Sequence, residues 1–300
     1  MSVLITGANG LVGSRLVARL ADQEDVIAQG RGPARGPAQK VGRYHDVDLS
    51  QAGALRELIT RLKPKAILHA AAMTDVDACE RDPVLAWRLN VGSVEEAALG
   101  AREVGARLVA ISTDYVFDGE DGPYGEEDVP NPRGAYARSK RAGEEAALLL
   151  APNAAVARVA VVYSGHPGAR RTFAQGTVEA LLAGKEVKAF GDQVVSPTLA
   201  DNAAELITGL WKSGQGGIFH CSGASVVSRV EFCVALARKL GADERLIVPT
   251  RLADAKLLAP RPLKAGLEVG KIQALLGEGA PLTLDQQLDR FLRERAEARQ

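Results

Sequence analysis

The chain has 300 residues, 46% of them hydrophobic and 25% charged, which is an ordinary globular composition. This length suits one large domain, or one domain with a smaller satellite. The 37 basic residues equal the 37 acidic ones, so the sequence lacks the general positive field that binds nucleic acids or anionic membranes.

The sequence favours a protein of a reducing compartment with no membrane anchor. No apolar run reaches the roughly 18 residues that a spanning helix needs. The N-terminus enters strand-like sequence directly and lacks the basic and apolar regions of a signal peptide. Three scattered cysteines, Cys79, Cys221 and Cys233, suit buried thiols better than a disulfide framework or a zinc site. We therefore expect a cytoplasmic protein.

Short apolar strands alternate with segments of helical periodicity through the first half of the chain. The predicted strands lie at 3–5, 26–28, 66–68, 108–111 and 159–162, and the predicted helices at 11–21, 51–62, 84–104 and 137–150. Apolar strands separated by helices predict a parallel sheet that is covered on both faces. We predict an α/β fold with a doubly wound parallel sheet of the Rossmann type.

The regularity weakens after about residue 165, where Gly and Pro become frequent. Helical patterns recur near 171–183, 201–212, 228–240 and 283–298, with only short strand candidates between them. We predict a dinucleotide-binding domain over residues 1–165. A smaller, mixed, substrate-binding lobe over residues 166–300 is expected to be interleaved with it.

A glycine-rich motif lies between the first predicted strand and the first predicted helix. Residues 6–13 read TGANGLVG. Gly7 permits a tight turn, Gly10 lets the backbone approach a pyrophosphate, and Gly13 lets the helix lie close to the sheet. The start of the helix supplies oriented N–H donors to the phosphates. This motif predicts a dinucleotide site.

The end of the second predicted strand indicates which dinucleotide is preferred. An NAD-binding site usually has Asp or Glu there, to bind the adenosine ribose. This chain has Gly30, followed by Arg31 and Arg35. An arginine without a carboxylate favours the 2′-phosphate of NADPH, although these arginines could also be a solvated loop. We expect NADPH, with NADH possible.

A YxxxK pair opens the predicted helix near residue 137. Tyr136 and Lys140 are four residues apart, so their side chains share one helix face. A lysine ammonium beside a phenol is expected to lower the phenol's pKa and make it a usable proton donor. Thr113, at the end of a predicted strand, is expected to face Tyr136 and hold the substrate oxygen, with Ser112 as the alternative.

These residues together resemble the dTDP-4-dehydrorhamnose reductase family of the extended short-chain dehydrogenase/reductase superfamily. Residues 112–119 read STDYVFDG, and PYGE at 123–126 leads on to Tyr136. The resemblance continues at AAAMTDVD over 70–77, SPT over 196–198, FHCSG over 219–223 and the Arg261-Pro262 pair. It covers nearly the whole chain, and its most specific part is residues 113–140.

The resemblance implies a set of site residues. Tyr136 is the expected proton donor, assisted by Lys140 and Thr113. From the motif and the resemblance together, the expected cofactor contacts are Gly7, Asn9, Gly10, Leu11, Val12, Gly13, Arg31, Asp46, Val47, Ala70, Ala71, Ala72, Thr74, Tyr136 and Lys140. The expected substrate contacts are Thr113, Asp114, Val161 and Arg261, the last through the diphosphate.

The resemblance implies reduction of dTDP-4-dehydro-L-rhamnose to dTDP-L-rhamnose. Val161 stands where the family commonly has a tryptophan, which favours the alternative of another sugar-nucleotide epimerase or reductase. A non-catalytic NADP-binding subunit, like the regulatory subunit of methionine adenosyltransferase, is a third hypothesis. A dehydratase would carry a second acid after Asp114, where this chain has Tyr115.

We expect a small-molecule sugar-nucleotide partner, no nucleic acid or membrane partner, and a monomer or homodimer. We expect no metal, because the histidines at 45, 69, 166 and 220 show no ligand spacing.

Overall fold

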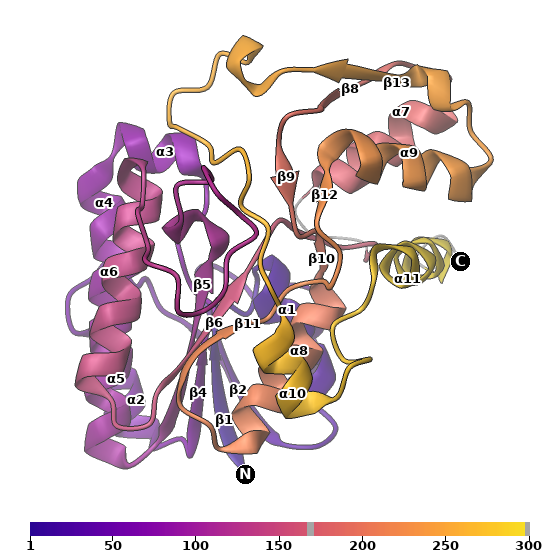
Figure 1. Cartoon of the computed structure of the whole chain (residues 1–300). Helices are drawn as coiled ribbons and strands as arrows, with labels where there is room; N and C mark the ends of the chain where they lie inside the picture. Colours follow the sequence, from indigo (N-terminus) through magenta and orange to yellow (C-terminus); the bar gives the residue numbers. More distant parts are fainter. Residues whose placement is uncertain (167–170, 298–300) are drawn as a thin grey trace.

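The structure is a computed structural model that describes residues 1–166 and 171–297 (Figure 1). Its centre is a seven-stranded sheet of order β11-β6-β5-β4-β1-β2-β3, in which every neighbouring pair is parallel. The strands are β1 (Ser2–Thr6), β2 (Asp25–Gly30), β3 (Tyr44–Asp46), β4 (Ala66–His69), β5 (Arg107–Thr113), β6 (Ala155–Val159) and β11 (Gly217–His220). The predicted doubly wound parallel sheet is confirmed.

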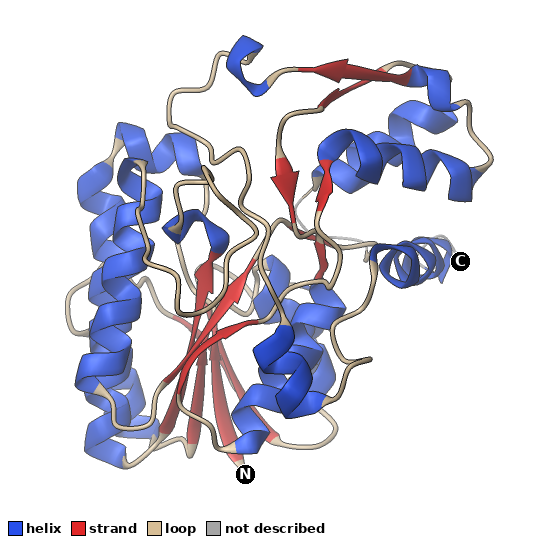
Figure 2. Cartoon of the chain, in the orientation of Figure 1, coloured by secondary structure: helices blue, strands red, loops and turns tan. Residues whose placement is uncertain are grey.

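Helices cover both faces of this sheet, because strand side chains alternate between the faces. Leu4 belongs to a buried cluster with α2 (Ala54–Leu62), α5 (Ser93–Val104) and α6 (Gly134–Leu150). Its neighbours Val3 and Ile5 belong to the opposite cluster, with α1 (Leu11–Leu20), α8 (Ala200–Ser213) and α10 (Gly270–Leu276). Figure 2 shows the resulting three layers.

A smaller lobe lies beyond the carboxyl ends of the strands (Figure 1). Its helices are α7 (Phe173–Leu182), α9 (Arg229–Leu240) and α11 (Leu284–Glu297). Its short pairs are parallel β8 (Val187–Phe190) with β13 (Ile247–Thr250), antiparallel β9 (Val194–Val195) with β12 (Val227–Ser228), and parallel β7 (Val162–Tyr163) with β10 (Thr198–Leu199). Tyr163, Phe232 and Phe291 are fully buried in its own core.

The two parts are interleaved in the chain. After entering the lobe, the chain returns to supply α8 and β11 to the sheet layer, crosses again, and returns once more as α10. The short helical segments are α3 (Val76–Arg81), α4 (Pro83–Trp87), η1 (Gly36–Lys40), η2 (Arg88–Gly92), η3 (Asp114–Val116), η4 (Glu244–Leu246) and η5 (Leu252–Asp254). Among the described residues, no helix combines the length and apolar character that crossing a bilayer requires.

Two elements differ from the sequence prediction. The strand predicted at 159–162 is wrong: β6 spans 155–159, and the chain breaks at Val161, whose φ is +41°. The run of β-branched residues hides this break, because such residues rarely adopt a positive φ. The helix predicted at 84–104 is divided by a π-helical turn, Arg88–Gly92, and α3 precedes it.

Candidate active site

The glycine loop lies where the connections after β1 and β4 diverge, at the switch point of the sheet. Gly7 has a φ of +64°, and a Cβ there would lie 2.7 Å from the amide nitrogen of Ala71. A Cβ on Gly13 would lie 2.2 Å from the carbonyl oxygen of Gly7. Gly10 N donates to the same oxygen at 2.8 Å. The loop is therefore a bare backbone turn at the start of α1, and its shape fits a dinucleotide pyrophosphate.

Buried hydrogen bonds hold the β4 loop against this turn. Thr6 Oγ1 accepts from Ala71 N at 3.2 Å and bonds to His69 Nδ1 at 2.9 Å. His69 Nε2 bonds to Ser93 Oγ at 3.1 Å. Burial and the Lys140 charge lower the pKa of His69 to about 3, so the imidazole is neutral. These contacts position the predicted cofactor residues 70–72, whereas Thr74 is exposed.

Asn9 ties the glycine loop to the end of β2. Its side chain donates to Tyr44 Oη at 2.9 Å and accepts from Arg35 N at 2.9 Å. A Cβ on Gly30 would lie 2.5 Å from that phenol oxygen and 2.9 Å from Asn9 Nδ2. Asn9 and Tyr44 thus fill the space where an NAD-type carboxylate would begin. Asn9, predicted to bind cofactor, holds the surrounding loop.

The loop after β2 carries two arginines on the protein surface. Arg31 and Arg35 are exposed and form no ion pair with the described residues. Asp46 accepts a hydrogen bond from Gly32 N at 2.7 Å, which fixes the loop backbone between Arg31 and Arg35. Gln29, which the sequence prediction missed, donates to Val47 O at 2.7 Å. It accepts from Gly7 N at 3.2 Å, so it joins three cofactor-side segments.

The three predicted catalytic residues converge at the carboxyl end of β5. Thr113 ends that strand, and Tyr136 and Lys140 lie in the first turns of α6. All three are buried. Burial raises the pKa of Tyr136, while hydrogen bonding from the neighbouring Thr113 hydroxyl opposes that rise. Lys140 Nζ donates to Ile111 O at 2.7 Å, and burial lowers the pKa of the ammonium to about 8.

The expected effect of Lys140 on the phenol is wrong for this structure. We predicted a lowered pKa for Tyr136, but its pKa is raised. Burial is the largest influence, the Asp114 charge adds to it, and Lys140 is not among the groups that shift this pKa. The ammonium is instead turned to the Ile111 carbonyl.

Two polar residues position the start of α6. The Glu80 carboxylate accepts from Ala135 N at 2.8 Å, and an acidic group is stabilising at a helix N-terminus. Asn90, fully buried in the π-helical turn, donates to Ser139 Oγ at 3.0 Å and accepts from Met73 N at 2.8 Å. Asn90 therefore links the β4 loop to the helix that carries Tyr136. No local pattern in the sequence indicated either role, although Asn90 is one of the residues that carry the family resemblance.

Asp114 and Tyr115 continue the site toward the lobe. Asp114 is 1% exposed, and burial raises its pKa to about 7. Its Oδ1 accepts from Thr113 Oγ1 at 2.9 Å. Tyr115 packs edge-on against Tyr136 with ring centres 5.7 Å apart. Tyr115 also lines a cavity of about 390 Å³ beside Arg261.

The remaining predicted substrate residues lie at the lobe junction. Arg261 Nη2 donates to Asp77 at 3.0 Å, and Nη1 to Ala259 O at 2.9 Å, so the guanidinium joins the lobe to α3. Val161 stands in the break between β6 and β7, and its carbonyl accepts from Thr198 N at 3.3 Å.

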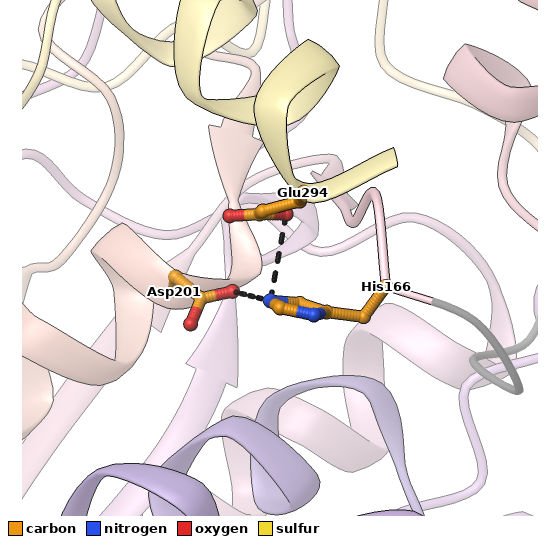
Figure 3. Close-up of side chains that lie close together, drawn as sticks. All are labelled: His166, Asp201 and Glu294. Atoms are coloured by element: carbon orange, nitrogen blue, oxygen red, sulfur yellow. Dashed lines mark hydrogen bonds and ion pairs between the residues drawn. The ribbon is translucent and has the colours of Figure 1, made fainter. Parts of the chain in front are cut away.

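One cluster outside this site combines side chains of metal-binding type. Figure 3 shows His166 against Asp201 and Glu294, whose ligand atoms lie within 4.8 Å of one another. The His166 ring bonds to Asp201 at 3.0 Å. Arg15 donates to Asp201 at 3.0 Å, and Arg290 lies 3.6 Å from Glu294. Because these arginines already neutralise the carboxylates, the cluster fits an ion-pair network better than a cation site.

Comparison with known proteins gives the family. A model described as the RmlD substrate binding domain matches residues 1–296. The chain belongs to the RmlD family. The predicted family and superfamily are thereby confirmed.

Two relatives and one solved structure carry reductase names. The probable low-salt glycan biosynthesis reductase Agl14 of Haloferax volcanii is 34% identical, over 95% of each chain. The dTDP-4-dehydrorhamnose reductase of Mycobacterium tuberculosis is 35% identical, over 86% of this chain and 82% of that one. The Bacillus anthracis dTDP-4-dehydrorhamnose reductase, solved in complex with NADP, has a TM-score of 0.85 at 26% identity, over 98% and 99% of the chains. The predicted class, an NAD(P)H-dependent oxidoreductase, is confirmed.

A relative of a different kind also matches this RmlD-family chain. The rat methionine adenosyltransferase 2 subunit beta is 32% identical, over 94% of this chain and 85% of that one. It bears on the third hypothesis, a non-catalytic subunit.

Proposed function

We propose that the protein uses NADPH to reduce the 4-keto group of a dTDP-linked 6-deoxy sugar, converting dTDP-4-dehydro-L-rhamnose to dTDP-L-rhamnose. The observation that carries this proposal is the convergence of Thr113, Tyr136 and Lys140 at the carboxyl end of β5, two strands along the same edge of the sheet from the glycine loop that follows β1. We place the reaction in the cytoplasm, where the free, buried thiols of Cys79, Cys221 and Cys233 would stay reduced.

The residues fit NADPH in two places. The bare turn at Gly7, Gly10 and Gly13 would hold the pyrophosphate, and Arg31 and Arg35 would bind the 2′-phosphate from outside the loop. Bound NADPH supplies the hydride that reduces C4 of the sugar. Lys140 would bind the nicotinamide ribose.

The protein's own residues handle the proton. The raised pKa of Tyr136 keeps its phenol protonated near neutral pH, which is the state a proton donor requires. Tyr136 would transfer that proton to O4 as negative charge develops there. The Thr113 hydroxyl, once turned from Asp114 Oδ1, would donate to the same oxygen and hold the carbonyl in place. Asp114 and Arg261 would contact the sugar and diphosphate.

The test is NADPH oxidation with dTDP-4-dehydro-L-rhamnose generated in situ, with NADH in parallel. Tyr136→Phe should keep NADPH affinity but lower turnover by about 10²–10⁴, because it removes the general acid. Tyr163→Phe is the matched control, since that phenol lies in the lobe core and makes only a 3.5 Å contact with Gln287. Turnover by Tyr136→Phe at the wild-type rate would refute the assigned role.

The same assay separates the second candidate, a non-catalytic NADP-binding subunit, which the similarity to the rat subunit favours. Such a subunit would bind NADPH tightly and oxidise none of it with any 4-keto sugar nucleotide. Net oxidation with a different sugar nucleotide only would favour another sugar-nucleotide reductase. An epimerase would interconvert two sugar nucleotides with no net oxidation of NADPH.

A further inference from the structure

Arg229 has no part in the reaction described so far, yet its side chain faces the site from the lobe. It opens α9, directly after the Ser228 cap. Its Nε donates to Gln193 Oε1 at 3.2 Å, and its guanidinium carbon lies 4.1 Å from the centre of the Phe173 ring. Gln193 in turn donates to Pro262 O at 3.3 Å, next to Arg261 in the chain. The guanidinium is therefore held rigidly beside the cavity wall.

One donor of this guanidinium is left over. Arg229 Nη1 is buried and has no hydrogen-bond partner among the described residues. A buried, unsatisfied donor on a charged group is costly, so such a group calls for a partner. Within the described part of the chain, no carboxylate pairs with Arg229, even though α9 is rich in charge.

Asp114 carries the complementary unsatisfied atom. Its Oδ1 is used by Thr113, whereas its Oδ2 is buried and has no partner among the described residues. The Arg229 charge acts on Asp114 and on its neighbour Tyr115, lowering the pKa of each against the larger effect of burial. The geometry places them in one region: Tyr115, next to Asp114, lines the same cavity as Pro262, and Gln193 links Pro262 to Arg229. Among the described residues, Arg229 and Asp114 form no ion pair.

Hydrogen-bond chemistry selects the group that fits both atoms. The Arg229 charge favours the ionised form of Asp114, whose Oδ2 only accepts, whereas Arg229 Nη1 only donates. A diphosphate oxygen only accepts, so it would satisfy the arginine and repel the carboxylate. A sugar hydroxyl donates to one and accepts from the other. Because Asp114 directly follows Thr113, this hydroxyl belongs next to the reacting carbonyl.

We propose that Arg229 is a specificity-determining residue that, together with Asp114 Oδ2, binds the 3-hydroxyl of the sugar beside the reacting C4 carbonyl. This rests on the proposed function in that it takes a 4-keto sugar nucleotide as substrate. In this arrangement the sheet layer supplies the catalytic residues, and the lobe recognises the sugar through Arg229.

Equilibrium binding to the NADP⁺-loaded protein tests this. We compare dTDP-L-rhamnose with dTDP alone, for wild type, Arg229→Gln and Arg229→Lys. Arg229→Gln should weaken dTDP-L-rhamnose by about 10- to 100-fold, which is the range for a hydrogen bond to a charged group, and leave dTDP unchanged. Arg229→Lys keeps the charge but loses the planar guanidinium with its several donors. Its affinity for dTDP-L-rhamnose should therefore lie between those of wild type and Arg229→Gln. Arg238→Gln, on the exposed side of α9 and paired with Glu244, is the matched control and should match wild type.

The outcomes separate this inference from the proposed reaction. Unchanged NADP⁺ affinity shows that each variant is folded. Equal weakening of dTDP-L-rhamnose and dTDP would assign Arg229 to the diphosphate and overturn the inference, as would no weakening of either. If the wild-type protein reduces no 4-keto sugar nucleotide, but Arg229→Gln still weakens the binding of dTDP-L-rhamnose and not of dTDP, the inference is supported and the proposed reaction is overturned. In turnover, wild type should prefer the 3-hydroxy substrate to its 3-deoxy analogue, and Arg229→Gln should lose that preference.

Discussion

Burial has opposite effects on the two residues of the YxxxK pair. It raises the pKa of the Tyr136 phenol and lowers that of the Lys140 ammonium to about 8. The phenol therefore stays protonated through the neutral range. The ammonium loses its proton just above that range, so within this pair the pH response near neutrality is expected to come from Lys140 rather than from the proton donor.

NADPH affinity should consequently fall as the pH rises above about 8. A lysine whose pKa is lowered is charged below that pKa and neutral above it, and only the charged form can give the ribose a charge-assisted hydrogen bond while it also donates to Ile111 O. Fluorescence titration from pH 6.5 to 9.5 would show the loss, which should level off at about 10- to 100-fold, the range for one hydrogen bond from a charged group. Lys140→Arg stays charged throughout and should give a flat profile. A flat profile in wild type would contradict the prediction.

The segment between β2 and β3 is a rigid loop despite its glycines. Asn9 and Tyr44 occupy the space at the strand end, and Asp46 holds the backbone at Gly32. The side chains of Arg31 and Arg35 are left facing solvent. The element thus offers positive charge where an NAD-specific protein offers a carboxylate.

Removing those arginines should change the choice of cofactor. Arg31→Ala with Arg35→Ala should weaken NADPH by about 10- to 100-fold and leave NADH within about twofold, because only NADPH carries the 2′-phosphate. Arg43→Ala, an exposed arginine nearby that pairs with Asp25, is the matched control. Equal losses of affinity for both cofactors would indicate collapse of the loop. Unchanged NADPH affinity would show that the two arginines do not bind the 2′-phosphate.

Local patterns in the sequence predicted some elements of the site and not others. Glycine spacing and the four-residue interval from Tyr136 to Lys140 are properties of a single turn or helix, so they are readable from one segment. Gln29, Asn90 and Arg229 act across segments that are distant in the chain, and their partners emerge only once the sheet is assembled. The break at Val161 was hidden because its neighbours are ordinary strand formers.

At the scale of the whole molecule, an ion-pair network fastens the lobe to the sheet layer. Asp201 on α8 bonds to His166 at the entry to the lobe and to Arg15 on α1, while Glu294 brings in α11 (Figure 3). Burial would raise the pKa of Asp201, but the His166 hydrogen bond and the Arg15 charge lower it, so the carboxylate is ionised.

Asp201→Asn should therefore lower the free energy of unfolding by about 1–3 kcal/mol, since it leaves partly buried cations without their partner. Urea unfolding at pH 7 measures this. Glu205→Gln, a more exposed acid on the same helix that pairs with Arg19 and Arg290, should cost less than about 1 kcal/mol. Equal stability of Asp201→Asn and wild type would show that the network adds nothing.

The return of the chain to the sheet layer has a consequence for synthesis. The apolar face of β1 and α1 is covered by α8, and part of that cover is packed by α10, which ends at Leu276. A ribosome makes the nucleotide-binding strands first, so this face emerges uncovered and stays so until α8, which ends at Ser213, has been translated. During that interval it is a surface for chaperones or for aggregation. About two thirds of the chain must be translated before the first helix can be buried.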